Sequence, residues 1–197
     1  PKNEVELTEE IVRLQNANPD RQITFNTYPT NVERLLRIVS DSPRKVVLHA
    51  KRAHLIKDSL NEDYPYYYLP EDKKYSDLNP ELEVSYDELL ADNHKYLWQA
   101  VSDYDKLQVG GLYIHSNAEP LGDFDPAYKP FVEQFAKNKI EFIALRCSGH
   151  ADEKELKEII GGIQPAILVP VHTLHPELEE NPFGKRILPK RGQTATL

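Results

Sequence analysis

Two histidines near the C-terminus each follow a short apolar run, at the point where a strand is expected to end. His150 lies in the segment SGHA after the run IEFIALR (140–146), and His172 lies in PVHT after AILVPV (166–171). If these strands are parallel neighbours, their carboxyl ends meet at one edge of the sheet, where open α/β sheets bind ligands. Imidazole groups collected there can transfer protons or bind a metal ion.

The residues around His150 favour a bound phosphate group. Ser148 supplies a hydroxyl donor, Gly149 allows a close backbone approach, and Asp152 begins a helix whose N-terminus attracts anions. A histidine at a strand end is nevertheless more often an ordinary hydrogen-bonded residue, so spacing alone leaves both interpretations open. Cys147 is expected to pack in the interior, because no neighbouring residue marks a partner for a thiolate.

Alternating strand and helix patterns must position these loops. Strands are expected at 23–28, 45–50, 110–116, 140–146 and 166–171, and helices at 7–17, 30–41, 51–60, 127–139 and 152–163. This order implies parallel pairing through right-handed crossovers, so we predict an α/β fold. Thr8 is expected to cap the first helix, and Thr30 or Asn31 the second. Residues 87–103 fit either a helix or a strand, and 61–84 are expected to be mostly irregular.

Other polar residues are expected to be structural or solvated. Lys51, Arg52 and Lys57 are typical of a solvated helix face. His115 and Glu119 could line a cleft, but a solvated loop is the stronger expectation, because proline, glycine and aspartate follow.

Composition excludes several classes of protein. The chain of 197 residues has a net charge of −8, which argues against tight non-specific binding to nucleic acid through a basic surface. No apolar run could span a bilayer and no signal peptide is recognisable, so no membrane partner is expected. A single cysteine excludes an intrachain disulfide framework and favours a cytoplasmic location. Because the sequence lacks methionine, we interpret it as a piece of a longer protein.

The C-terminal segment SGHADEKELKEIIGGIQPAILVPVHT (148–173) resembles the β-CASP branch of the metallo-β-lactamase superfamily, which includes ribonuclease J. It matches the S-G-H motif of that branch at His150 and the P-V-H motif at His172. The segment ITFNTYPTNVERLLRIVSDSPRKVVLHAKR (23–52) resembles the opening of the β-CASP insert. HSNAEP (115–120) is similar to the S-x-G-E-P loop of ribonuclease J, with alanine in place of its glycine.

The resemblance implies a particular division of the α/β fold. It implies a β-CASP domain, with a parallel sheet and flanking helices, followed by the C-terminal half of a metallo-β-lactamase αββα sandwich. We expect residues 1–20 to form a connecting helix, 21–135 the β-CASP domain and 136–197 the metallo-β-lactamase part. The family's main metal motif, H-x-H-x-D-H, is absent from the sequence. The N-terminal half of the metallo-β-lactamase domain is therefore expected upstream of residue 1.

The resemblance also implies roles for single residues. His172 matches a ligand of one of two active-site zinc ions, for which manganese is an alternative metal. His150 matches the catalytic histidine that contacts the scissile phosphate and assists the leaving group. Ser148, Arg146 and Ser116 would contact substrate phosphate. Arg146 stands where ribonuclease J has a further histidine, and arginine can bind a phosphate but cannot transfer protons at neutral pH.

The function that the resemblance implies is two-metal hydrolysis of a phosphodiester, most simply of RNA. The chain alone is expected to be inactive and free of zinc, because one histidine cannot hold zinc with useful affinity. Expected partners are RNA or single-stranded nucleic acid, the upstream half-domain and a second copy of the chain. Two alternatives stay open. One is a non-catalytic β-CASP subunit of a nucleic-acid-processing complex, and the other is a small-molecule metallo-hydrolase, which the acidic charge permits.

Overall fold

The computed structural model describes residues 3–147, 153–171, 173, 175–192 and 194. The chain divides into two compact units, Pro1–Cys147 and Ser148–Leu197. Within the described ranges, no helix combines the length and the apolar character needed to cross a membrane.

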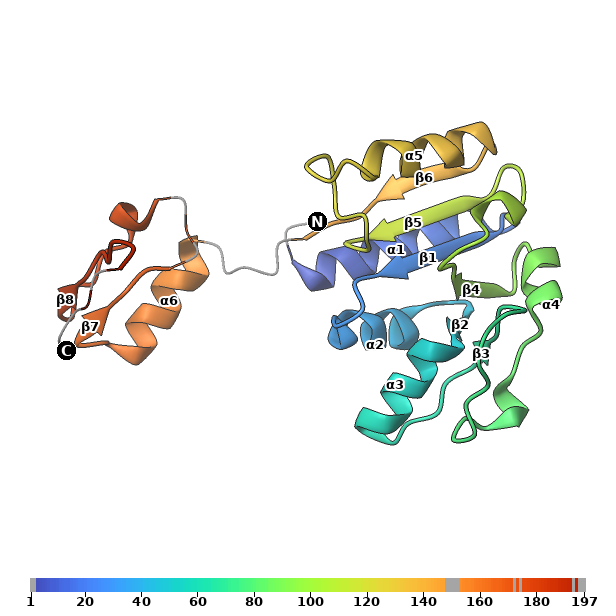
Figure 1. Ribbon diagram of the computed structural model, residues 1–197, viewed down its shortest axis with the longest axis horizontal. Coiled ribbons are helices and arrows are strands. Elements are labelled where there is room, and N and C mark those ends of the chain that lie inside the picture. Colours follow the sequence, from blue (N-terminus) through green and yellow to red (C-terminus); the bar gives the residue numbers. More distant parts are fainter. Residues whose placement is uncertain (1–2, 148–152, 172, 174, 193, 195–197) are drawn as a thin grey trace. The chain divides into compact units, whose positions relative to one another are not determined.

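A parallel sheet of six strands forms the centre of the first unit (Figure 1). The strand order is β3-β2-β4-β1-β5-β6. The strands are β1 (Ile23–Thr27), β2 (Lys45–His49), β3 (Tyr66–Tyr67), β4 (Tyr96–Gln99), β5 (Leu112–Ser116) and β6 (Glu141–Ala144). Each neighbouring pair is parallel, so the carboxyl ends of all six strands lie at the same edge. The predicted α/β fold with parallel pairing is confirmed.

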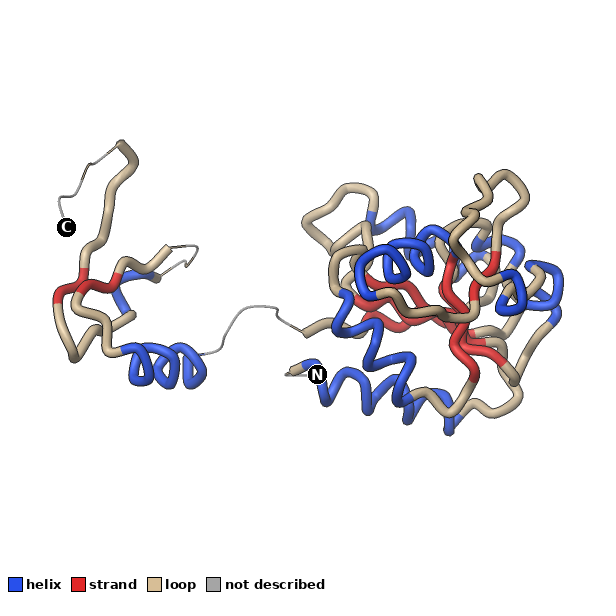
Figure 2. Tube along the Cα trace, turned by 90° about the horizontal axis from the view of Figure 1, so that it is seen from below, coloured by secondary structure: helices blue, strands red, loops and turns tan. Residues whose placement is uncertain are grey.

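Helices cover both faces of this sheet (Figure 2). One face packs against α1 (Glu4–Ala17), α2 (Val32–Asp41) and α3 (Ala50–Leu60), and the other against α4 (Tyr86–Ala91), the 3-10 turn η2 (Tyr104–Lys106) and α5 (Tyr128–Lys137). Successive strand side chains point to opposite faces. Val46 and Leu48 therefore belong to the first core, and Val47 belongs to the second.

Asparagine side chains begin the first two helices. Asn31 Oδ1 accepts a hydrogen bond from the backbone N–H of Arg34 at 3.1 Å, so Asn31 is the cap of α2. Asn3 caps α1 in the same way, through the N–H of Glu6 at 2.9 Å. The predicted cap at Thr8 is therefore wrong. Thr8 lies inside the helix, and its hydroxyl donates to a backbone carbonyl one turn earlier.

The ambiguous segment 87–103 contains both kinds of element. Ser85 caps the short helix α4, and the chain then enters β4, which is buried along its whole length. A second 3-10 turn, η1 (Pro80–Leu82), lies in the preceding connection. The mixed pattern of the sequence thus reflects a helix and a strand in succession.

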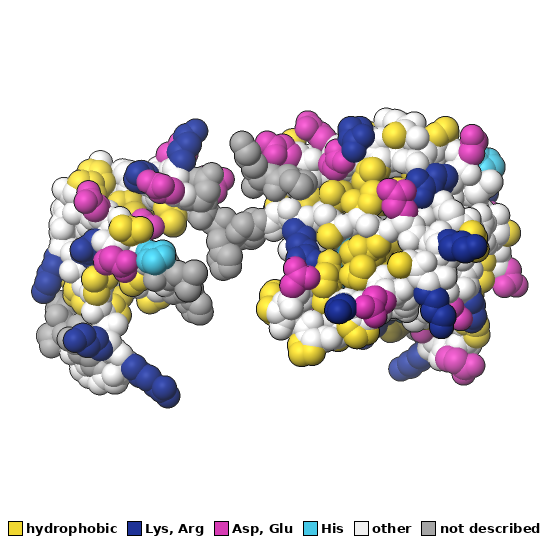
Figure 3. All heavy atoms as spheres, turned by 90° about the horizontal axis from the view of Figure 1, so that it is seen from above, with side chains coloured by type: hydrophobic (Ala, Val, Ile, Leu, Met, Phe, Trp, Pro, Cys, Tyr) yellow, Lys and Arg dark blue, Asp and Glu magenta, His cyan; other side chains and the backbone are white. Residues whose placement is uncertain are grey.

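The second unit contains α6 (Glu153–Ile163), β7 (Ile167–Leu168), η3 (Pro176–Leu178) and β8 (Lys185–Arg186). β7 and β8 pair in parallel. Large apolar side chains of this unit lie open on its surface (Figure 3), and Leu178 is 71% exposed. β6 belongs to the first unit, because it pairs with β5. The domain boundary expected after residue 135 falls within α5.

Candidate functional site

The sequence predicts five site residues, of which the structure describes two. Ser148, His150 and His172 lie outside the described residues, so their expected roles stay predictions. Ser116 is the last residue of β5, and Arg146 follows the neighbouring strand β6. Both described residues therefore lie at the carboxyl edge of the sheet, as the parallel order requires.

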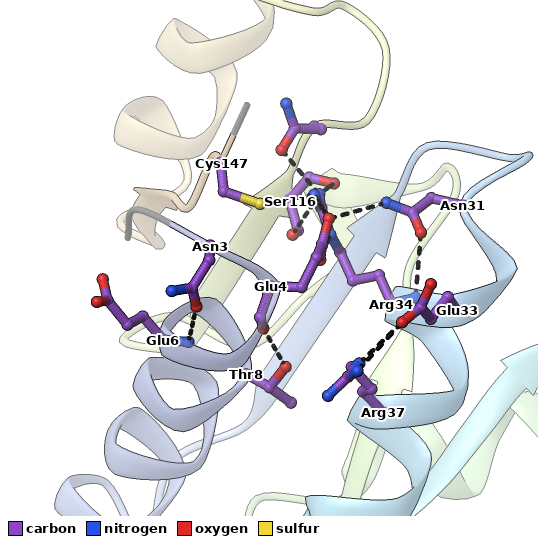
Figure 4. A network of polar contacts seen from close by, with 11 residues as sticks. Asn3, Glu4, Glu6, Thr8, Asn31, Glu33, Arg34, Arg37, Ser116 and Cys147 are labelled. Carbon is purple, nitrogen blue, oxygen red and sulfur yellow. Dashed lines mark hydrogen bonds and ion pairs between the residues drawn. The ribbon is translucent and has the colours of Figure 1, made fainter. Parts of the chain in front are cut away.

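A buried arginine organises the end of β5 (Figure 4). The guanidinium of Arg34 donates two hydrogen bonds of 2.7 Å to the two carboxylate oxygens of Glu4. It also donates to Asn117 Oδ1 at 2.7 Å and to the carbonyl and hydroxyl oxygens of Ser116, both at 3.3 Å. A further N–H points to the sulfur of Cys147 at 3.1 Å. Arg34 thus joins α1, α2, the end of β5 and the residue that precedes Ser148.

Local sequence explains how this cluster forms. The Asn31 cap fixes the first turn of α2, which places the Arg34 side chain over the sheet edge. Asn31 also donates to Glu4 at 3.4 Å. The hydrogen bonds from Arg34 hold the pKa of the Glu4 carboxyl below its ordinary value. A forked arginine–carboxylate pair of this kind is geometrically specific, so the cluster defines one position for α1.

Cys147 is packed, as predicted. Its side chain is buried, and that burial raises the pKa of the thiol, with its hydrogen bond to Glu4 acting in the same direction. A thiol that stays protonated is a poor nucleophile. Cys147 therefore acts as a structural partner of Arg34.

Ser116 is also part of the Arg34 cluster. Its exposed fraction is 0%, and its hydroxyl oxygen accepts a hydrogen bond from Arg34. These contacts give Ser116 a structural role at the end of β5. Its expected contact with substrate phosphate stays a prediction.

One donor of Arg146, its Nε–H, has no hydrogen-bond partner among the described residues. Its guanidinium carbon lies 4.8 Å from the ring centroid of Tyr128, in a cation–π arrangement. A side chain on Gly122 would place its Cβ 2.7 Å from an Arg146 nitrogen, so glycine makes room for the guanidinium. In the described part of the chain, Arg146 pairs with no carboxylate, and its buried Nε has no hydrogen-bond partner. The side chain is a half-buried positive charge suited to an anion.

His115 is not in a solvated loop, contrary to the prediction. It is fully buried, and its ring packs 5.2 Å from that of Phe131 and 5.4 Å from that of Phe142. Burial lowers its pKa, so the ring is neutral near pH 7 and its Nε2–H donates to the Pro120 carbonyl at 2.9 Å. The apolar environment explains the difference, because α5 covers this end of β5. His115 thereby fixes the start of the 115–120 loop.

The predicted solvated face at 51–57 is wrong for Arg52. Arg52 is 9% exposed, whereas Lys51 is exposed and Lys57 pairs with Asp63 at 2.7 Å. β2 passes directly into α3, so the first turn of that helix lies at the sheet edge and Arg52 points inward. Sequence reasoning missed this residue, although its place directly after a buried strand is a usable signal.

The described residues do not form a zinc centre by themselves. None of their histidine, cysteine, aspartate and glutamate side chains gather in threes or more in a way that could hold a metal ion. His175 is exposed, and its Nδ1 lies 3.1 Å from the carboxylate of Glu177.

A family model matches part of the chain. Residues 139–180 match RMMBL, the Zn-dependent metallo-hydrolase RNA specificity domain. This range runs from β6 through η3 and includes His150 and His172. The predicted resemblance is thus confirmed at the level of this domain.

A solved structure is similar over nearly the whole chain. It is the crystal structure of a protein of unknown function from Enterococcus faecalis V583, with 53% sequence identity and a TM-score of 0.91. The match covers 97% of this chain and 45% of that protein, so the chain spans less than half the length of that relative. No curated protein matches the chain.

Proposed function

We propose that this chain is part of a metal-dependent hydrolase that cleaves the phosphodiester bonds of RNA. The observation that carries the proposal is the RMMBL match over residues 139–180, because both histidine loops predicted from the sequence fall within it. A domain described by RNA specificity in Zn-dependent metallo-hydrolases favours RNA as the substrate over a small molecule.

The chain's own residues would bind and orient the substrate phosphate. In this proposal His150 contacts the scissile phosphate and protonates the leaving oxygen, and Ser148 donates to a phosphate oxygen. Arg146 adds a permanent positive charge. The Nε of its guanidinium, which has no hydrogen-bond partner among the described residues, supports this role. Ser116 would hold the loop beneath the substrate.

His172 would be one ligand of the metal site. A bound zinc or manganese ion would supply a hydroxide nucleophile and stabilise charge on the phosphate. We propose that the remaining ligands come from the part of a longer protein that this chain does not span, since the chain covers 45% of its E. faecalis relative. In the same proposal, residues 21–135 form a β-CASP domain and 136–197 contribute to the metallo-β-lactamase domain.

The test is RNA cleavage by the full-length protein that carries these residues, with zinc or manganese supplied. We expect cleavage of RNA, and we expect His150→Ala to reduce its rate by about 10²–10⁴-fold, because a general acid contributes that much. His94→Ala is a matched control, since His94 is an exposed histidine whose ring contacts its neighbour Asn93. The control should cleave like the wild type.

Other outcomes would contradict the proposal in distinguishable ways. RNA binding without cleavage at any metal concentration would indicate a non-catalytic subunit. Cleavage of a small phosphodiester such as bis(p-nitrophenyl) phosphate, with RNA left intact, would indicate a small-molecule hydrolase. Wild-type rates for the His150→Ala variant would remove that residue from the mechanism.

A further inference from the structure

A second feature of the same sheet edge is a cavity of about 320 Å³ at the carboxyl ends of β1, β2 and β4. Its volume is within the range of small-molecule sites. The chain leaves β1 and β2 toward α2 and α3 on one face, and it leaves β4 toward η2 on the other face. Open α/β sheets bind ligands where the connections diverge in this way. The cavity therefore occupies the expected position for a ligand.

The floor of the cavity carries positive charge. β2 runs directly into the eleven-residue helix α3, whose first turn has no acidic residue and no side-chain cap. The N-terminus of such a helix favours an anion. Lys51 and Arg52 lie in this first turn and line the cavity. The N-terminus of α3 and these two cationic side chains therefore contribute positive charge to the same cavity.

Arg52 lacks the partner that a buried arginine usually has. One guanidinium N–H donates to the carbonyl of Pro29, and no ion pair joins Arg52 to a carboxylate within the described part of the chain. Burial lowers its pKa, and no acidic neighbour acts against that effect. A buried charge without a counter-ion is costly, so an anionic ligand would stabilise it.

Thr27 gives a second, independent sign of a ligand. Thr27 lines the cavity and is 1% exposed, and its buried hydroxyl has no hydrogen-bond partner among the described residues. Buried hydroxyls are rarely left unpaired, because each lost hydrogen bond costs free energy. An oxygen-rich ligand would supply the hydrogen-bond partner that the Thr27 hydroxyl lacks.

The rest of the polar lining is held in place. Gln99 donates to Asn26 at 3.0 Å and accepts from the backbone N–H of His49 at 3.3 Å. Burial lowers the pKa of His49, so its neutral ring donates through Nε2 to Asp72 at 2.8 Å. Glu119 is the single carboxylate among the residues that line the cavity, against two permanent cations. The site is preorganised and positive in a chain whose net charge is −8.

Apolar side chains form the remaining wall. Pro29, Leu55 and Val101 line the cavity, and Leu55 is 46% exposed. A flat ring can cover these side chains and leave its phosphate against α3. We propose that this cavity binds a nucleotide, with its phosphate on Lys51, Arg52 and Thr27 and its base or sugar on Leu55 and Val101. The proposed site needs no metal, and no residue after Glu119 in the sequence lines it. It is therefore separate from the residues proposed for hydrolysis.

The test is titration of AMP into the 197-residue chain in the presence of EDTA, followed by calorimetry and amide NMR. We expect signals of Thr27, Lys51 and Arg52 to shift, and AMP to bind several-fold more tightly than inorganic phosphate. Lys51→Ala should weaken AMP binding by about tenfold, and Thr27→Val by about fivefold, because each removes one phosphate contact. Thr27→Val keeps the shape of the side chain, and NMR spectra report whether each variant is folded.

Lys45→Ala is the control for charge, since Lys45 is an exposed lysine at the amino end of β2. It should bind AMP like the wild type. The proposal is overturned if millimolar AMP shifts none of these signals, if folded Lys51→Ala and Thr27→Val bind AMP normally, or if phosphate alone binds as tightly as AMP.

Titration with an RNA oligonucleotide then distinguishes a nucleotide unit of an RNA strand from a free nucleotide as the ligand. If both variants weaken RNA binding by the same factors, the cavity takes a nucleotide unit of a strand. If RNA binding is unchanged while AMP binding weakens, the ligand is a free nucleotide. Both results support the site, and neither depends on whether the full-length protein cleaves RNA.

Discussion

Arg34 and Arg52 are both buried arginines at the carboxyl edge of one sheet, but their surroundings differ. Arg34 is 2% exposed and forms a forked pair with Glu4, with further contacts to Asn117 and Ser116. Arg52 is 9% exposed and contacts the Pro29 carbonyl, without an ion pair to a described carboxylate. The first arginine has its counter-ion within the protein, whereas the second has none among the described carboxylates. Burial alone does not separate a structural arginine from a ligand-binding one, whereas the presence of a carboxylate does.

The largest effect is expected from replacing each arginine by methionine. Arg34→Met should lower the free energy of unfolding by about 3 kcal/mol, because it leaves Glu4 without its partner. Arg52→Met should change it by no more than about 1 kcal/mol, because it removes an uncompensated charge along with one hydrogen bond. Urea unfolding of both variants measures the difference. Equal losses would show that the two sites do not differ as described.

Arg146 is a third arginine at this edge. A substitution at Gly122 tests how firmly the Arg146 side chain is held. Gly122→Ala should destabilise the first unit by about 1 kcal/mol, because the new Cβ would lie 2.7 Å from an Arg146 nitrogen. Gly161→Ala is the matched control within α6, where a Cβ meets nothing within 4 Å. It should be neutral or stabilising, since alanine favours helices. Thermal unfolding distinguishes the two, and equal shifts would mean that Arg146 moves aside freely.

The smallest effect concerns pH. The pKa of Glu4 is lowered from its ordinary value of 4.5, chiefly by hydrogen bonds from Arg34. A carboxyl whose pKa is lower in the folded state stabilises the fold above its unfolded pKa, and this contribution is lost as the pH falls through the folded pKa. The wild type should therefore lose stability below pH 4.5 more steeply than Glu4→Gln. Urea unfolding as a function of pH measures the slopes, and parallel slopes would contradict the expectation.

The sheet could be predicted from sequence, but the arginine clusters could not. Alternating strand and helix patterns are local, so the parallel α/β order and a cap at Thr30 or Asn31 follow from neighbouring residues. The pair between Arg34 and Glu4 joins α2 to α1, and the position of Arg52 depends on the Pro29 carbonyl in another loop. Contacts between elements carry no periodic signal. The charge pattern of 51–57 therefore indicated a solvated face where a buried cation lies.

The residues of the candidate site likewise divide into those that the sequence pattern indicates and those whose surroundings it does not predict. The spacing of Ser148, His150 and His172 resembles a family pattern, and the family match includes that range, while their roles stay predictions. The residues after His115 are typical of turns and therefore predict a solvated loop. The burial of His115 depends on Phe131 of α5, which packs over the end of β5.

Glu4 and Cys147 both contact Arg34, although one lies near the start of the first unit and the other is its last residue. The two ends of residues 3–147 therefore lie close together. Domains with adjacent ends tolerate transplantation and circular permutation. Residues 3–147 thus meet the geometric condition for transplantation or circular permutation.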